Sequence, residues 1–151
     1  MKFFLIIKSL TTKITNGILL LFIGAMHTRL VLSADGFGQQ FSVYAKSWFF
    51  SISSGMDELP AVAGTTNFEV FAAFWFFYFG VALIPLGLLV HSIEKEKRAL
   101  PYSFTVSYLL FVLLGCYMVP NSGMTFIMLP HALYMFVKNH MRRKHLKSIS
   151  S

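Results

Sequence analysis

Two ionisable side chains, His27 and Arg29, interrupt an apolar run in the segment GAMHTRLVL, residues 24–32. An imidazole can exchange protons or hydrogen-bond a ligand, and a guanidinium can bind a phosphate or a carboxylate. Such groups are costly inside a membrane and are candidates for function there. Residues two apart differ by about 200° around a helix. We therefore expect His27 to face the protein interior and Arg29 to anchor the helix at the outer interface.

Other polar positions extend this candidate site. Glu69 shares a helical face with Gly80 and Gly87, and small residues mark close helix–helix approach in membranes, so we expect Glu69 to face inward near the outer end. His131 follows Pro130 in another apolar run and is expected near mid-membrane. The predicted ligand-binding residues are His27, Glu69, His131, Asn121 and Ser122, the last two in an outer turn.

The residues do not favour a metal or haem centre. A haem between His27 and His131 would have axial ligands at different depths, and no other haem signature is present. Zinc needs three or four close ligands, and the only candidate ligands are His27, Glu69 and His131. Cys116 is the only cysteine, so no internal disulfide or thiolate cluster can form. We therefore predict no cofactor, and we assign no catalytic residue.

The composition is typical of a membrane protein. Hydrophobic residues make up 56% of the chain, aromatic residues 17% and charged residues only 13%. Soluble domains average roughly 45–50% apolar and about 25% charged residues. A soluble fold of 151 residues would have more apolar surface than it could bury. The predicted fold class is therefore an all-α membrane protein.

The apolar runs predict a single integral membrane domain, residues 1–151, that forms a four-transmembrane-helix bundle. A spanning helix needs about 20 residues, with a range of roughly 17–25. The predicted spans are residues 14–33, 68–91, 102–119 and 122–138. Residues 39–53 carry apolar side chains at helical spacing, which predicts a short amphipathic helix in the outer interface. Trp48 and Trp75 are expected in the outer aromatic belt, as interface anchors with Arg29.

The positive charges predict the orientation. With four spans and an inner N-terminus, Lys and Arg divide eleven to two in favour of the inner side. Both termini are then expected in the cytoplasm, with a basic tail at residues 138–151. The rival interpretation is a signal peptide cleaved between Ala34 and Asp35, but bulky Leu32 lies where a small residue is preferred. Basic residues at the chain ends and in one loop fit this orientation better than a nucleic-acid groove, so no nucleic-acid partner is predicted.

Three short motifs carry a resemblance to a known family. They are Gly24-x-x-His27-Thr28, then Phe76-Phe77-x-Phe79-Gly80, and last Gly115 through Pro120-x-Ser122-Gly123 to Pro130. In their order and spacing, over residues 17–136, the chain resembles an uncharacterised family of small bacterial four-helix membrane proteins, a domain of unknown function. The resemblance implies a protein of the bacterial inner membrane and implies no reaction.

The sequence is consistent with three functions. The first is a non-enzymatic membrane protein that binds a lipid-like or other hydrophobic molecule, or a protein partner, through an outward-facing polar pocket. The second is an enzyme on a lipophilic substrate, with His27 and His131 as acid–base groups oriented by Glu69. The third is an accessory subunit of a larger membrane complex. We expect membrane lipids among the partners in each case.

Overall fold

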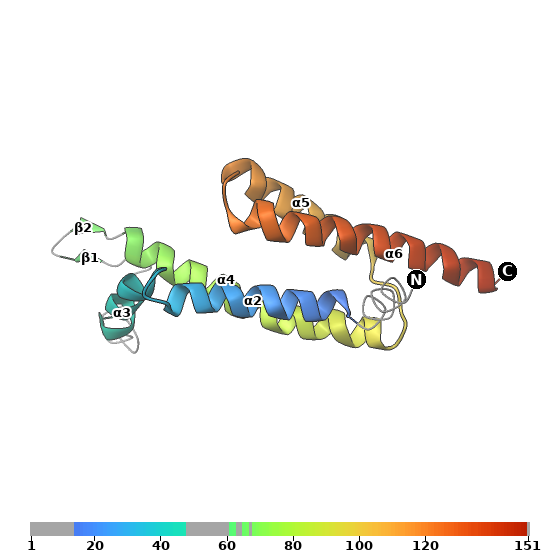
Figure 1. Cartoon of the computed structure of the whole chain (residues 1–151), viewed down its shortest axis with the longest axis horizontal. Helices are drawn as coiled ribbons and strands as arrows, with labels where there is room; N and C mark the ends of the chain where they lie inside the picture. The colour runs from blue at the N-terminus through green and yellow to red at the C-terminus, as the bar shows by residue number, and fades with distance from the viewer. Residues whose placement is uncertain (1–13, 48–60, 63–64, 67, 151) are drawn as a thin grey trace, which may run out of the picture. The chain divides into compact units, whose positions relative to one another are not determined.

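A computed structural model describes residues 14–47, 61–62, 65–66 and 68–150 of the protein. In chain order the elements are α2 (Asn16–Leu32), α3 (Gly38–Ser47), β1 (Ala61–Val62), β2 (Thr65–Thr66), α4 (Phe68–Lys95), α5 (Tyr102–Met118), the π-helix η2 (Met124–Met128) and α6 (Leu129–Ser150) (Figure 1). The prediction of a helical fold is confirmed. The two short strands pair antiparallel, with Ala61 opposite Thr66, and are an addition that the sequence did not predict.

The helices differ in their ability to cross a membrane. Among the described residues, Ala72–Lys95 of α4 is the one segment that is long and apolar enough, with a mean hydropathy of 2.1. Helices α2 and α5 are apolar but have 17 residues each, the lower limit of roughly 17–25 for a span. Helix α6 has 22 residues, but its second half is basic. Length and composition alone therefore qualify one described helix as a span.

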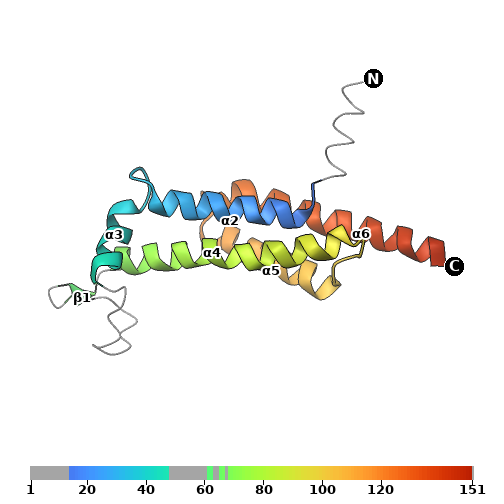
Figure 2. The same ribbon diagram turned by 90° about the horizontal axis from the view of Figure 1, so that it is seen from below.

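The chain divides into two compact units, one formed by Met1–Ile23 with Leu86–Ser151 and the other by Gly24–Pro85. In the first unit, α5 and α6 lie side by side as an antiparallel hairpin (Figures 1 and 2). The side chains buried along this hairpin include Thr105, Tyr108 and Val112 of α5 and Ala132, Met135 and Asn139 of α6. They lie about one helical turn apart on each helix, so burial follows the 3.6-residue period.

We call residues 122–150, which contain η2 and α6, the α6 arm; its start departs from α-helical geometry. Proline has no backbone N–H, so Pro130 cannot donate a hydrogen bond to the carbonyl of Phe126, and its ring would clash with that carbonyl. The wider π-turn of η2, Met124–Met128, ends two residues before this proline. A π-helical segment is rare and is frequently found at functional sites. The irregular backbone directly precedes His131.

Helix α4 ends in a Schellman motif. The N–H of Arg98 bonds the carbonyl of Ile93 at 3.2 Å, and the N–H of Lys97 bonds that of Glu94 at 3.0 Å. Lys97 has a φ of 58°, the left-handed conformation that this motif requires. Glycine usually occupies this position because it has no Cβ. The chain then turns towards α5.

Helix α6 holds the segment between α4 and α5. Asn139 accepts a hydrogen bond from the N–H of Leu100 at 2.8 Å and donates one to its carbonyl at 3.0 Å. Arg143 donates twice to the Leu100 carbonyl, at 3.1 and 2.5 Å. Arg142 donates to the carbonyl of Arg98 at 3.1 Å. We call these contacts the α6 clasp.

Glycines allow close approach of α2 and α4 in each unit. In the second unit, a Cβ on Gly24 would lie 2.8 Å from the carbonyl oxygen of Gly80. In the first unit, a Cβ on Gly87 would lie 2.9 Å from the carbonyl oxygen of Gly17. Real Cβ atoms do not approach backbone that closely, so only glycine fits at these contacts. The glycines therefore mark helix–helix packing, as their spacing predicted.

Candidate functional site

A buried hydrogen bond joins α5 to α6 in the first unit. The hydroxyl of Tyr108 lies 3.1 Å from Nδ1 of His131. The two rings meet edge to face, with centroids 5.7 Å apart. His131 is 6% exposed; its second ring nitrogen, Nε2, is buried and makes no hydrogen bond with the described residues, although the backbone of Asn16 lies near the ring. The Tyr108 hydroxyl therefore fixes the imidazole on its Nδ1 side.

Two hydroxyl groups near the start of the same arm are also without partners. The side-chain oxygens of Ser122 and Thr125 are buried and make no hydrogen bond within the described chain. The great majority of buried polar groups are paired, so each exception needs an explanation. Asn121, beside Ser122, is exposed in the turn. Of the predicted residues in this unit, His131 and Ser122 thus contribute buried polar atoms and Asn121 does not.

A second polar cluster lies at the start of α2 in the first unit. Glu94 accepts hydrogen bonds from the backbone N–H of Asn16 at 2.5 Å and from its side-chain amide at 2.6 Å. Asn16 is 1% exposed and Glu94 7%. The first N–H groups of a helix lack internal partners, and a carboxylate there is favoured by the helix dipole. Glu94 therefore caps α2 from another helix.

Thr15 completes this cap. Its hydroxyl accepts a hydrogen bond from the N–H of Ile18 at 3.2 Å and lies 2.8 Å from Nδ1 of His91. His91, Asn16 and Glu94 are not among the site residues predicted from the sequence. The signal was present, because His91 and Glu94 follow Gly87 by four and seven residues and extend the same helical face.

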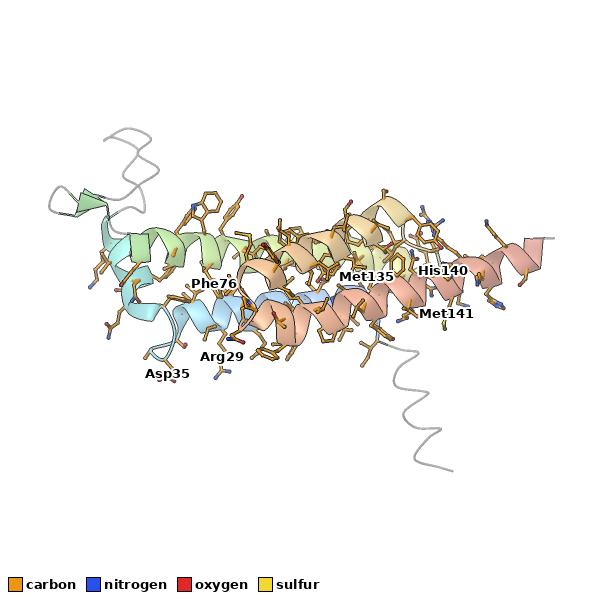
Figure 3. All side chains as sticks on the ribbon, turned by 90° about the horizontal axis from the view of Figure 1, so that it is seen from above. Arg29, Asp35, Phe76, Met135, His140 and Met141 are labelled. Atoms are coloured by element: carbon orange, nitrogen blue, oxygen red, sulfur yellow. The ribbon has the colours of Figure 1, made fainter. Side chains whose placement is uncertain are left out.

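His27 lies in an aromatic setting in the second unit. Its ring stacks on Phe76, with centroids 3.7 Å apart and planes inclined by 16°. Phe79 meets the ring edge-on at 5.2 Å. The side chain is half-buried on the α4 side of α2, where Figure 3 shows Phe76. His27, which we expect to face the protein interior, thus lies half-buried against Phe76 and Phe79 of α4.

Glu69 differs from the expectation that it faces inward. It lies in the first turn of α4 with an exposed side chain. It precedes Phe76 by seven residues, or about 10.5 Å along the helix axis at about 1.5 Å per residue. Within the described residues no ion pair joins it to His27. Exposure at a helix N-terminus suits a carboxylate, because water and the helix dipole both stabilise its charge.

The predicted interface anchors lie at the surface or outside the described residues. Arg29 is exposed and extends away from α4 (Figure 3). It borders an open groove of about 550 Å³, whose other lining residues are Ala25, Thr28, Leu32, Ser33 and Ile84. Trp75 is exposed and packs against Phe74 and Tyr78. Trp48 lies outside the described residues.

No three histidine, cysteine, aspartate or glutamate side chains come together as metal ligands in the part of the chain that the structure describes. The buried polar contacts of the first unit include the hydrogen bond between Tyr108 and His131 and those between Asn16 and Glu94. A family of unknown function (DUF6463) matches residues 11–142, a range that includes all of the predicted ligand-binding residues. The chain belongs to DUF6463.

Membership of DUF6463 confirms the expectation of an uncharacterised family. No curated protein and no solved structure matches the chain. The family description carries no activity.

Proposed function

We propose that the protein is a four-span protein of the bacterial inner membrane, with both termini in the cytoplasm. The eleven-to-two division of Lys and Arg supports this topology. Large apolar side chains along α5, among them Leu110, Leu114 and Tyr117, are exposed, as expected of a helix that faces lipid. A reporter that is active only in the periplasm, fused after Ser151, should stay silent. Activity there would contradict the proposed orientation.

The proposed role is the binding of a lipid-like molecule whose polar end is held at the start of the α6 arm. The observation that carries this proposal is the set of buried polar atoms on His131, Thr125 and Ser122 that make no hydrogen bond with the residues that the structure describes. A buried polar group without a partner costs about 1–3 kcal/mol. A ligand with a hydroxyl, amide or ester group would satisfy such atoms. Buried neighbours such as Met128 and Met135 offer an apolar, adaptable surface for its chain.

Mild detergent purification followed by mass spectrometry of the bound molecules tests this role. Replacement of His131 by Leu removes both ring nitrogens and should deplete the co-purifying lipid-like molecule. His145, exposed on the same helix, supplies the matched control, and its replacement by Leu should leave the bound molecules unchanged. A His131→Leu protein that retains the same molecules with unchanged stability would rule out a ligand site at His131. A protein that co-purifies instead would favour the accessory-subunit function.

The hydrogen bond between Tyr108 and His131 supports catalysis as a second candidate function. A tyrosine hydroxyl against an imidazole is an arrangement that can transfer protons. Tyr108→Phe retains the ring and removes the hydroxyl. Under the catalytic alternative, this variant should still bind the co-purifying molecule but no longer convert it on prolonged incubation. Under the binding role, neither wild type nor variant alters the molecule.

A further inference from the structure

We propose that the basic end of α6 docks on anionic phospholipid headgroups of the cytoplasmic leaflet. The inference rests on the proposed membrane topology and adds an interaction surface to it. The surface consists of three exposed lysines: Lys95 at the end of α4, Lys97 in the turn that follows, and Lys144 on α6. All three belong to the first compact unit.

The charge of this region is not balanced within the unit. Residues 86–150 contain eight Lys and Arg residues but only two acidic residues, Glu94 and Glu96. Glu94 is buried against Asn16, and Glu96 pairs with Arg98 at 3.0 Å. Helix α6 itself has no acidic residue. Like charges four residues apart destabilise a helix by about 0.2–0.5 kcal/mol per pair, so this segment gains from an external anion.

The arginines of the α6 clasp and the exposed lysine next to them have different roles. Arg142 and Arg143 donate to backbone carbonyls, and Tyr102 packs under the Arg143 guanidinium at 4.5 Å. These arginines are half-buried and fix α6 against the preceding segment. Lys144 lies directly after them and is exposed. The helix therefore continues beyond α5 (Figures 1 and 2) with its lysine charge presented outward.

The position of these cations favours a membrane over other polyanions. The basic part of α6 is continuous with the apolar segment that ends at Val137. Lys147 is ten residues further on, about 15 Å along the helix at 1.5 Å per residue. The headgroup layer of roughly 5–8 Å and a Debye length of about 8 Å together cover that distance. Every cation of the segment therefore lies within reach of the leaflet's surface potential.

Exposed apolar side chains among the cations fit the same partner. Met141 is 61% exposed and Leu146 43%. Figure 3 shows Met141 on α6 next to His140. Cations interleaved with apolar side chains are typical of helices that bind the membrane interface, where both kinds of group find a partner. An acidic protein or a nucleic acid would leave the apolar groups without a function.

The test uses the full chain in vesicles. An environment-sensitive dye is attached at Ser148→Cys in a Cys116→Ser background, and the protein is reconstituted into phosphatidylcholine alone or with added phosphatidylglycerol. Both leaflets have the same composition, so the direction of insertion does not affect the signal. The dye should shift to a more apolar environment only with phosphatidylglycerol, and high salt should reverse the shift. Each lysine is worth about a fivefold change in partitioning.

The variants separate charge from general insertion. Lys144→Gln should weaken the response about fivefold, and Lys95→Gln with Lys97→Gln should weaken it further. Lys46→Gln on α3, exposed and on the proposed outer side, is the control and should leave it unchanged. An equal response in both lipids, or one that the lysine variants do not alter, would overturn the inference. Flotation of the protein with both vesicle types tests the membrane proposal separately.

Discussion

Asn139 should be a key stabilising residue of the first unit, although it lies far along a basic helix. Asn139→Ala removes both hydrogen bonds to Leu100. Leu100 is 1% exposed, so its N–H would be buried without a partner, at about 1–3 kcal/mol. The Leu100 carbonyl would still accept hydrogen bonds from Arg143. The loss of its bond from Asn139 should therefore cost only about 0.5–1.5 kcal/mol. The expected destabilisation is therefore about 1.5–4.5 kcal/mol.

Unfolding of the detergent-solubilised protein by denaturant or heat measures this loss. His145→Ala, exposed on the same helix, should stay within about 0.5 kcal/mol of wild type. Arg143→Ala should cost less than Asn139→Ala, because Asn139 still pairs with both backbone groups of Leu100. The double variant should lose more than the two single losses together, since the Leu100 carbonyl is then unpaired. If Asn139→Ala and His145→Ala have the same stability, the clasp does not stabilise the fold.

The structure predicts the direction of the stability change for three further substitutions. Lys97→Gly should stabilise the protein by about 1 kcal/mol, because glycine adopts the left-handed conformation without strain; a lower melting temperature would contradict this reasoning. Gly24→Leu should destabilise by about 1–3 kcal/mol, because its Cβ meets backbone of Gly80, and a melting temperature equal to wild type would exclude that contact. Glu94→Ala should lower the free energy of unfolding by about 1.5–3 kcal/mol. It should also speed amide hydrogen exchange at the start of α2, beginning with the N–H of Asn16. Unchanged exchange would show that Glu94 is not the cap.

The helical fold could be predicted from the sequence, but two helix ends could not. The second predicted span stopped at residue 91, where the apolar run ends, whereas α4 continues to Lys95. The fourth stopped at residue 138, whereas α6 continues to Ser150. A change from apolar to basic residues marks the edge of a membrane, not the end of a helix. Lys, Arg, Met and Leu are good helix formers, and no glycine or proline follows Pro130 in that helix.

Only part of the candidate site could be predicted from the sequence, because a signal that marks one residue does not identify the residue that it contacts. His131 was singled out as an ionisable group in an apolar run, yet Tyr108 was not, because a tyrosine in such a run is ordinary. Glu69 was assigned to an inward face from its spacing to Gly80. That spacing gives a direction around the helix, but the exposure of a side chain also depends on how far the neighbouring helix extends. At the first turn of α4 the carboxylate is exposed.

The start of the α6 arm is where local preference and observed structure disagree most. Between residues 122 and 131 there are a proline inside a helix, a π-turn before it and three buried polar atoms that find no partner in the described part of the chain. Each is unfavourable by itself, and an apolar residue at position 131 or an alanine at 125 would remove part of the penalty. Natural sequences depart from such local rules mainly at functional sites. In the clasp, by contrast, both backbone groups of Leu100 are paired, and the glycine contacts are closely packed, although the Thr28 hydroxyl beside Gly80 is another buried group without a partner among the described residues. The contrast within one chain is the reason to place the ligand at His131, Thr125 and Ser122, and to assign Asn139 and Gly24 to stability.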